Sequence, residues 1–293
     1  MFRLILNFYI KTSLHVGVAV CCFVKTSFFL AKLKANFLLV IAVFFATVLG
    51  YNLLKYWCVF VNRQILVPKH LGLIIISFAA TFGFMVVFIQ LNSTEKLLFV
   101  GAGLLTLFYP VFRKNGILKL FWIGFVVSFV TVFIPLNSNS FSTCFIICSL
   151  CERFFIVVAL MIPFEIYHYA TDAFHLKTLP QRVGILNSKK IGYFFVALAF
   201  ATSLIYLQNQ SNLYQLMVIE TIMYFSILAA IYFSKPAQSF YFTAFWVESI
   251  PIFWWLLFFV CKWNWSKQLT SAPTKNLHFH QKCKYRFVLL FSD

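Results

Sequence analysis

The sequence of 293 residues is 62% hydrophobic and 11% charged, with a mean hydropathy of +0.89. An average soluble domain is about 25% charged, so this composition excludes a water-soluble globular protein. The net charge of +17 is spread between apolar runs and does not gather in one hydrophilic segment. We therefore interpret the basic residues as determinants of membrane topology and as contacts for anionic lipid head groups. We expect no nucleic-acid partner.

Apolar runs near the length of about 20 residues that crosses a bilayer as a helix recur from Ser13 to Val260. Backbone groups in lipid must find their hydrogen-bond partners within helices or closed barrels. Because the runs are continuous and do not alternate with polar residues, the sequence predicts an all-α, polytopic membrane bundle. The nine predicted spans are 13–30, 37–54, 71–91, 97–112, 120–136, 144–164, 191–207, 213–234 and 240–260.

The N-terminal stretch between Arg3 and Lys11 has no small-residue cleavage pattern after it, so we expect the first span to stay in the protein. Residues 1–262 are predicted to form a single transmembrane domain, and residues 263–293 a short, basic, disordered tail. Basic residues concentrate in cytoplasmic loops, which predicts a cytoplasmic N-terminus. Thirteen basic residues then lie on the cytoplasmic side, whereas the outer loops hold only Lys32, Lys34 and Lys96.

The chain contains only seven acidic residues, and two of them follow the sixth span in a regular spacing. Glu165, His168, Asp172 and His175 are separated by three, four and three positions, which places them on one face if the segment is helical. Carboxylate oxygens suit Mg²⁺, and imidazoles shift the preference toward transition metals. The segment is therefore either a metal site or a polar, amphipathic helix at the membrane surface.

Other polar residues lie within predicted spans, where burial is costly. Glu152 and Arg153 are adjacent on the sixth span and so point in different directions. Glu220 and Glu248, on the eighth and ninth spans, are either relay or ligand groups or partners in interhelical hydrogen bonds. The sixth span also holds Cys144, Cys148 and Cys151 on one helical face, which we interpret as packing rather than a metal or redox site.

Residues 163–184 read Pro-Phe-Glu-Ile-Tyr-His-Tyr-Ala-Thr-Asp-Ala-Phe-His-Leu-Lys-Thr-Leu-Pro-Gln-Arg-Val-Gly. The segment resembles the second aspartate-rich motif of the UbiA-type intramembrane prenyltransferase superfamily, in which an acidic residue, Arg-Asp, another Asp, Thr-Leu-Pro and Gly follow one another. The matching positions are Glu165, Asp172, Thr178, Leu179, Pro180 and Gly184. The resemblance, strongest to bacterial members, implies a nine-helix bundle in the bacterial inner membrane with a lipid-lined cavity open to the cytoplasm. It also implies Mg²⁺-assisted transfer of a polyprenyl group from a diphosphate to an acceptor.

The sequence departs from the superfamily pattern in both motifs. The first motif, Asn-Asp-x-x-Asp, is expected after the second span, where Asn52 is followed by Leu53, Leu54, Lys55 and Tyr56 without a carboxylate. In the second motif, Tyr167-His168 replaces Arg-Asp. The resemblance thus implies at most one Mg²⁺, with Glu165, His168 and Asp172 as candidate ligands. The candidate diphosphate-binding residues are Asn52, Lys55, Arg63, Lys69, Lys177 and Arg182.

Two hypotheses of different classes follow from this pattern. The chain is either a non-catalytic relative that binds an isoprenoid, a quinone or another amphiphile in the cavity, or an active, divergent prenyltransferase in which basic residues replace part of the metal charge. In both cases we expect membrane lipids and an isoprenoid or polyprenyl diphosphate as partners. A transporter of another family is a third and more remote alternative, because the sequence shows no pair of broken helices in two halves.

Overall fold

The computed structural model describes residues 2–56, 71–137, 141–170, 177–208, 213–236 and 238–271, and within these ranges all regular structure is helical. The elements, in chain order, are α1 (Phe2–Lys11), α2 (Leu14–Leu30), α3 (Phe37–Lys55), α5 (Leu71–Gln90), α6 (Ser93–Leu107), α7 (Tyr109–Arg113), α8 (Gly116–Ser128), η3 (Phe129–Phe133), α9 (Ile134–Leu136), α10 (Thr143–Tyr167), α11 (Leu179–Val183), α12 (Ile185–Leu207), α13 (Leu213–Phe233), η5 (Phe242–Val247) and α14 (Ile250–Ser271).

Eight segments of the described chain are long and apolar enough to cross a membrane, and α1 with α2 makes a ninth candidate that is bent by 65°. The predicted all-α membrane bundle is therefore confirmed. The seventh span begins at Ile185, six residues before the predicted start. Its first turns contain Asn187, Lys189 and Lys190, which lower the hydropathy but continue the helix because long basic side chains extend toward the membrane surface.

The chain divides into two compact units, Met1–Trp255 and Leu256–Asp293. The first unit contains all helices up to the first turns of α14. In the second unit the described residues, 256–271, continue α14 as a helix. The candidate site lies wholly within the first unit.

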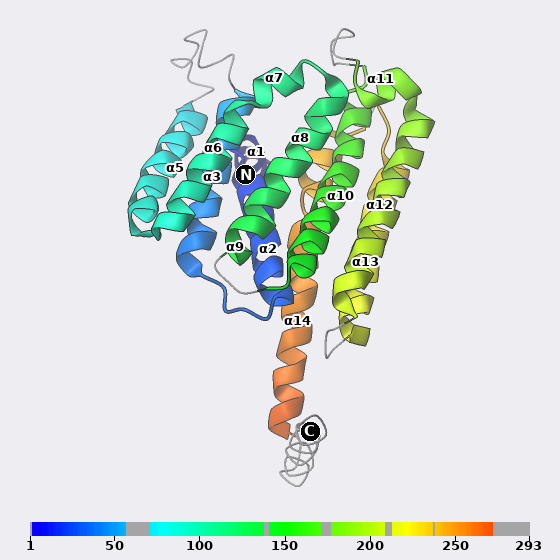
Figure 1. Cartoon of the computed structure of the whole chain (residues 1–293). Helices are drawn as coiled ribbons and strands as arrows, with labels where there is room; N and C mark the ends of the chain where they lie inside the picture. Colours follow the sequence, from blue (N-terminus) through cyan, green and yellow to red (C-terminus); the bar gives the residue numbers. More distant parts are fainter. Residues whose placement is uncertain are drawn as a thin grey trace. The chain divides into compact units, whose positions relative to one another are not determined.

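Helix α10 is the central element of the first unit. It packs against α8, α12 and α13, while α3 packs between α2 and α5, and Figure 1 shows α8, α10 and α12 as neighbouring ribbons. Half of the most apolar part of α10 is buried inside the bundle, compared with a third or less of each of the other seven unbroken candidate spans in the described ranges. Glu152, Arg153 and Glu165 on α10 are enclosed by protein.

Two wide, π-helical turns interrupt the spans, and each comes shortly before a proline. Element η3 precedes Pro135, and η5 precedes Pro251. Proline lacks the backbone N–H that would donate to the preceding turn of the helix. A π-helical turn is a common way to accommodate this interruption of the helical hydrogen bonds. In η5 the Glu248 N–H donates to the Thr243 carbonyl at 3.3 Å. These turns widen the helix locally, and η5 forms one wall of a groove described below.

Candidate functional site

Several predicted site residues lie at one end of the bundle, the end that carries α7 and α11, hereafter the α7–α11 end (Figure 1). Helices α3 and α10 end there, and α8 and α12 begin there, because successive spans run in opposite directions. Asn52 and Lys55 come from the last turn of α3, Glu165 from the last turn of α10, and Arg182 from α11. The structure thus brings together residues more than 100 positions apart in the sequence.

Asn52 is fully buried, and its side chain links three helical segments. Its Nδ2 donates to the Thr12 carbonyl and to Ser77 Oγ, both at 3.1 Å, and its Oδ1 accepts from Ser13 Oγ at 2.6 Å. Both amide N–H groups are therefore used within the protein. The loss of such partners by a buried amide costs about 1–3 kcal/mol, so these hydrogen bonds make Asn52 a structural link between the helices.

The break between α1 and α2 makes this link possible. Ser13 adopts a left-handed backbone conformation, with φ of 62°, and the chain turns by 65° at this point. The turn interrupts the helical hydrogen-bond ladder, so the Thr12 carbonyl is available to accept from Asn52. Neither α1 nor the hydrogen bonds of Ser13 and Ser77 were predicted from the sequence, although a hydroxyl group in an apolar span is a sign of such a contact.

Lys55 is exposed and stays available to a ligand. Its ammonium lies over the rings of Tyr51 and Tyr56, 5.8 and 5.4 Å from their centroids, and is within electrostatic range of the carboxylate of Glu248, the residue that follows η5. The Tyr56 hydroxyl donates to the Lys11 carbonyl at 2.9 Å, and burial raises the pKa of Tyr56. Lys55 is therefore a positioned cation beside two aromatic rings and a carboxylate.

Glu165, the first acidic position of the second motif, makes a salt bridge with Lys119 of α8. The Lys119 Nζ lies 2.7 Å from Glu165 Oε1, and the two side chains are 13% and 2% exposed. Removing one partner of such a buried pair leaves an uncompensated charge, which is strongly destabilising. The carboxylate that the sequence pattern assigns to a metal is thus engaged by a cation of the protein itself.

The remaining predicted metal ligands are not brought into a cluster by the described chain. Helix α10 ends at Tyr167, and His168, its C-terminal cap, is exposed and lies against Tyr167. The helical stripe proposed from the three-and-four spacing therefore does not continue on α10 beyond Tyr167. Asp172 and His175 lie outside the described residues, as do two of the candidate diphosphate ligands, Arg63 and Lys69.

The Thr-Leu-Pro-Gln-Arg-Val-Gly stretch forms α11 and the start of α12. Arg182, an exposed residue, donates from Nε to the Lys177 carbonyl at 2.9 Å and from Nη2 to Asn115 Oδ1 at 3.4 Å. Gly184 has φ of +82°, a conformation that favours glycine, and it turns the chain into α12. Lys177 and Arg182 therefore lie exposed at the α7–α11 end, where their charges are accessible to an anion.

The described residues around Glu165 supply a single carboxylate where the superfamily implies a clamp of several for Mg²⁺. Mg²⁺ prefers octahedral oxygen coordination, usually through one or two carboxylates together with water and substrate phosphates. The described ranges contain no group of three His, Cys, Asp or Glu side chains placed to hold a metal. In addition, the carboxylate of Glu165 pairs with Lys119, whose positive charge would repel a metal ion bound beside it.

A second polar cluster lies deeper in the bundle, toward the end opposite α7 and α11. Both oxygens of Glu152 on α10 accept hydroxyl groups, from Tyr224 at 2.6 Å and from Tyr206 at 2.7 Å. The adjacent Arg153 points elsewhere, with its guanidinium stacked over Phe23 at 4.2 Å. Glu152 of α10 thus makes hydrogen bonds to α12 and α13. The two tyrosines were missed because their spans were read only for acidic and basic residues.

No family model matches this chain, and no curated protein matches it in sequence. Solved structures do match it. A UbiA homologue from Aeropyrum pernix K1 superposes with a TM-score of 0.62 at 13% identity, over 84% of this chain and 98% of its own. The chain has the UbiA-type fold. A second UbiA homologue, from Archaeoglobus fulgidus and bound to GPP and Mg²⁺, gives a TM-score of 0.56 at 13% identity, over 85% of this chain and 98% of its own.

A digeranylgeranylglyceryl phosphate synthase studied in membranes also has the UbiA-type fold of this chain, with a TM-score of 0.52. The identity is 15%, and the match covers 89% of this chain and 98% of the synthase. All three proteins match over most of the transmembrane body, but at these low sequence identities the match establishes only a shared fold. The predicted UbiA-like architecture is confirmed, and the chemistry has to be argued from the side chains of this chain.

Proposed function

We propose that this chain is a non-catalytic relative of the UbiA-type prenyltransferases that binds an isoprenoid or a quinone-like amphiphile in the membrane. The observation that carries the proposal is the salt bridge between Lys119 and Glu165. It neutralises Glu165, one of the two carboxylates of the second motif, and the first motif has no carboxylate at all. The role is thus one of binding and carrying a lipid in isoprenoid metabolism.

The polar groups at the α7–α11 end support a ligand of low charge. Asn52 is engaged with Ser13, Thr12 and Ser77, whereas Lys55 offers one ammonium between two tyrosine rings. One cation beside aromatic rings suits a carbonyl or phenol head group, which needs a hydrogen-bond donor and a flat apolar surface. The apolar tail of such a ligand is then covered by the membrane helices.

The alternative is an active, divergent prenyltransferase, and the exposed basic residues favour it. Lys55, Lys177 and Arg182 lie at the same end of the bundle, and basic side chains stabilise a departing diphosphate. The Archaeoglobus fulgidus homologue is itself bound to GPP and Mg²⁺. In this reading Glu165, His168 and Asp172 hold one Mg²⁺, and Asn52, Arg63 and Lys69 complete the diphosphate site.

One experiment separates the two functions. The purified chain in lipid nanodiscs is given a labelled polyprenyl diphosphate and Mg²⁺, with phenolic, quinone-precursor or haem acceptors, and both diphosphate release and bound lipid are measured. We expect retention of an isoprenoid or quinone-like molecule without release of diphosphate. Release that disappears in Asp172→Ala would instead establish the enzyme. The apolar ligand carried through purification is identified by mass spectrometry.

We further propose that the chain resides in a bacterial inner membrane with its N-terminus in the cytoplasm. The support is the concentration of basic residues at the α7–α11 end, which becomes the cytoplasmic end in this orientation. Lys55, Lys114 and Lys190 lie there, whereas Lys32 lies at the other end of α2. The proposed ligand would then enter from the cytoplasmic side or from the inner leaflet.

A further inference from the structure

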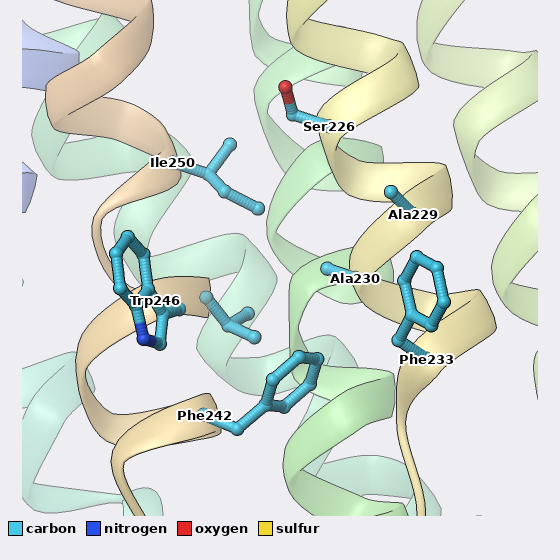
Figure 2. A pocket seen from close by; sticks show the side chains of 8 residues that line it. Ser226, Ala229, Ala230, Phe233, Phe242, Trp246 and Ile250 are labelled. Atoms are coloured by element: carbon cyan, nitrogen blue, oxygen red, sulfur yellow. The ribbon is translucent and has the colours of Figure 1, made fainter.

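A groove lies between α13 and η5, separate from the polar residues described above. It has a volume of about 390 Å³, within the range of about 300–1,000 Å³ that is usual for ligand sites. Figure 2 shows the small side chains of Ser226, Ala229 and Ala230 on α13, with Phe242, Trp246 and Ile250 on the opposite side. The lining is almost wholly apolar, which suits a hydrocarbon chain.

The groove exists because small residues on α13 meet a widened turn. Ser226, Ala229 and Ala230 leave space beside the helix, and the π-helical turn η5 displaces the facing segment. The aromatic rims stay accessible, since Trp246 is 66% exposed and Phe233 is 58% exposed. Both walls belong to candidate membrane spans, so the groove opens toward the hydrocarbon layer rather than toward water.

Two lysines lie near the end of α13 that carries Phe233, one of the residues that line the groove. Lys235 follows the last turn of α13 and is exposed, and its backbone N–H donates to Gln238 Oε1 at 2.9 Å. Lys189 of α12 donates to the Tyr232 carbonyl at 2.7 Å and lies within electrostatic range of Lys235. Among the described residues, neither lysine makes an ion pair with a carboxylate. Two positive charges therefore lie near the last turn of α13, which also supplies Phe233 to the groove.

We propose that this groove binds one acyl chain of an anionic phospholipid, whose phosphate lies at Lys235 and Lys189. The apolar groove suits the acyl chain, and the two lysines suit the phosphate head group of such a lipid. Juxtamembrane lysines attract anionic lipid by about 1 kcal/mol each, which gives preference over a zwitterionic lipid of equal chain length. The site is a lipid-binding site on the side of the bundle and does not depend on the function proposed for the α7–α11 end.

Native mass spectrometry of the whole chain tests the proposal. The protein is reconstituted with equal amounts of phosphatidylglycerol and phosphatidylcholine, released into detergent, and the retained lipids are counted. We expect one retained phosphatidylglycerol, a loss of that lipid in Ala229→Phe, which fills the groove, and about fivefold lower retention in Lys235→Gln.

The matched controls are Ala201→Phe, at an exposed alanine of α12, and Lys114→Gln, at an exposed lysine beyond α7. Both should retain lipid as the wild type does. If Ala229→Phe fails to fold, Ser226→Leu fills the same groove from one turn earlier. The proposal would be overturned if Ala229→Phe retained as much lipid as Ala201→Phe. It would also be overturned if the wild type retained no lipid, or if it retained an isoprenoid in place of the phospholipid. Retention without preference for phosphatidylglycerol would do the same.

Discussion

Lys119 Nζ lies 2.7 Å from Glu165 Oε1, and this pair joins the first turn of α8 to the last turn of α10. Glu165 is one of the two acidic positions by which the sequence resembles a metal-binding motif, and Lys119 is one of the basic residues between the apolar runs. The pair combines both into a neutral interhelical contact. It explains how a carboxylate remains buried at this point of the bundle when the rest of the motif has diverged.

Breaking this pair should destabilise the protein. Lys119→Met leaves the Glu165 carboxylate without its 2.7 Å partner, and because Lys119 is partly exposed we expect the lower end of the usual range, about 3 kcal/mol of unfolding free energy. The double variant Lys119→Met with Glu165→Leu should recover most of the loss, since no buried charge remains. Thermal unfolding in detergent measures both, with Lys114→Met as the control. A double variant as unstable as the single one would contradict this account.

The hydroxyl groups that reach Glu152 should contribute measurably to stability. Tyr224→Phe and Tyr206→Phe each remove one hydrogen bond to a buried carboxylate. Such bonds between membrane helices are worth up to about 1.7 kcal/mol, and we expect a loss of about that size for each. Tyr214→Phe provides the control, because Tyr214 is 81% exposed. Denaturant titration of the three variants gives the comparison, and equal stability of all three would show that Glu152 is held by other contacts.

A carboxylate placed at residue 52 should not create a metal site. Asn52→Asp replaces the Nδ2 donor by an oxygen that faces the Thr12 carbonyl at about the same position. Two acceptors then oppose each other in a buried place, so we expect a loss of at least about 1–3 kcal/mol and no gain of Mg²⁺ binding. Isothermal titration with Mg²⁺ and thermal unfolding test the two parts. Ser77→Ala, which removes only one acceptor, should be milder.

Two glycines should respond in different ways to the same substitution. A Cβ at Gly124 of α8 would lie 2.9 Å from Val158 and 3.1 Å from Phe154, whereas nothing lies within 4 Å of a Cβ at Gly101 of α6. Small residues allow close approach of membrane helices, and overpacking costs about 1–3 kcal/mol. Gly124→Leu should therefore separate α8 from α10 and lower the unfolding temperature, and Gly101→Leu should not. Similar unfolding temperatures would show that α10 shifts freely.

The proposed orientation can be measured directly. In a chain depleted of native cysteines, Lys32→Cys should react with a membrane-impermeant maleimide added outside intact cells. Lys190→Cys should react only after the cells are opened. The reason is the excess of basic residues at the α7–α11 end, where Lys190 lies. The opposite labelling pattern would reverse the orientation and would place the α7–α11 end on the outer side.

The membrane class and most span positions follow from local properties of the chain. Continuous apolar runs fix where helices cross the bilayer, because hydropathy acts on each segment independently of its neighbours. The break at Ser13 was harder to foresee. It depends on a left-handed residue, Ser13, whose hydroxyl donates to Asn52, 39 positions away in the sequence.

The sequence alone determined that this protein is a helical membrane bundle, and its motif at 163–184 correctly indicated the UbiA-type fold. It also singled out Asn52 and Glu165 as candidate ligands and Glu152 as an ionisable residue within an apolar span. Only the tertiary structure decided what these residues do, because each is satisfied by a partner on another helix: Ser77, Tyr224 and Lys119. Such pairs form between residues far apart in the chain and therefore depend on helix packing. Because a buried polar group without a hydrogen-bond partner is costly, the partner determines whether the group is tolerated at that position.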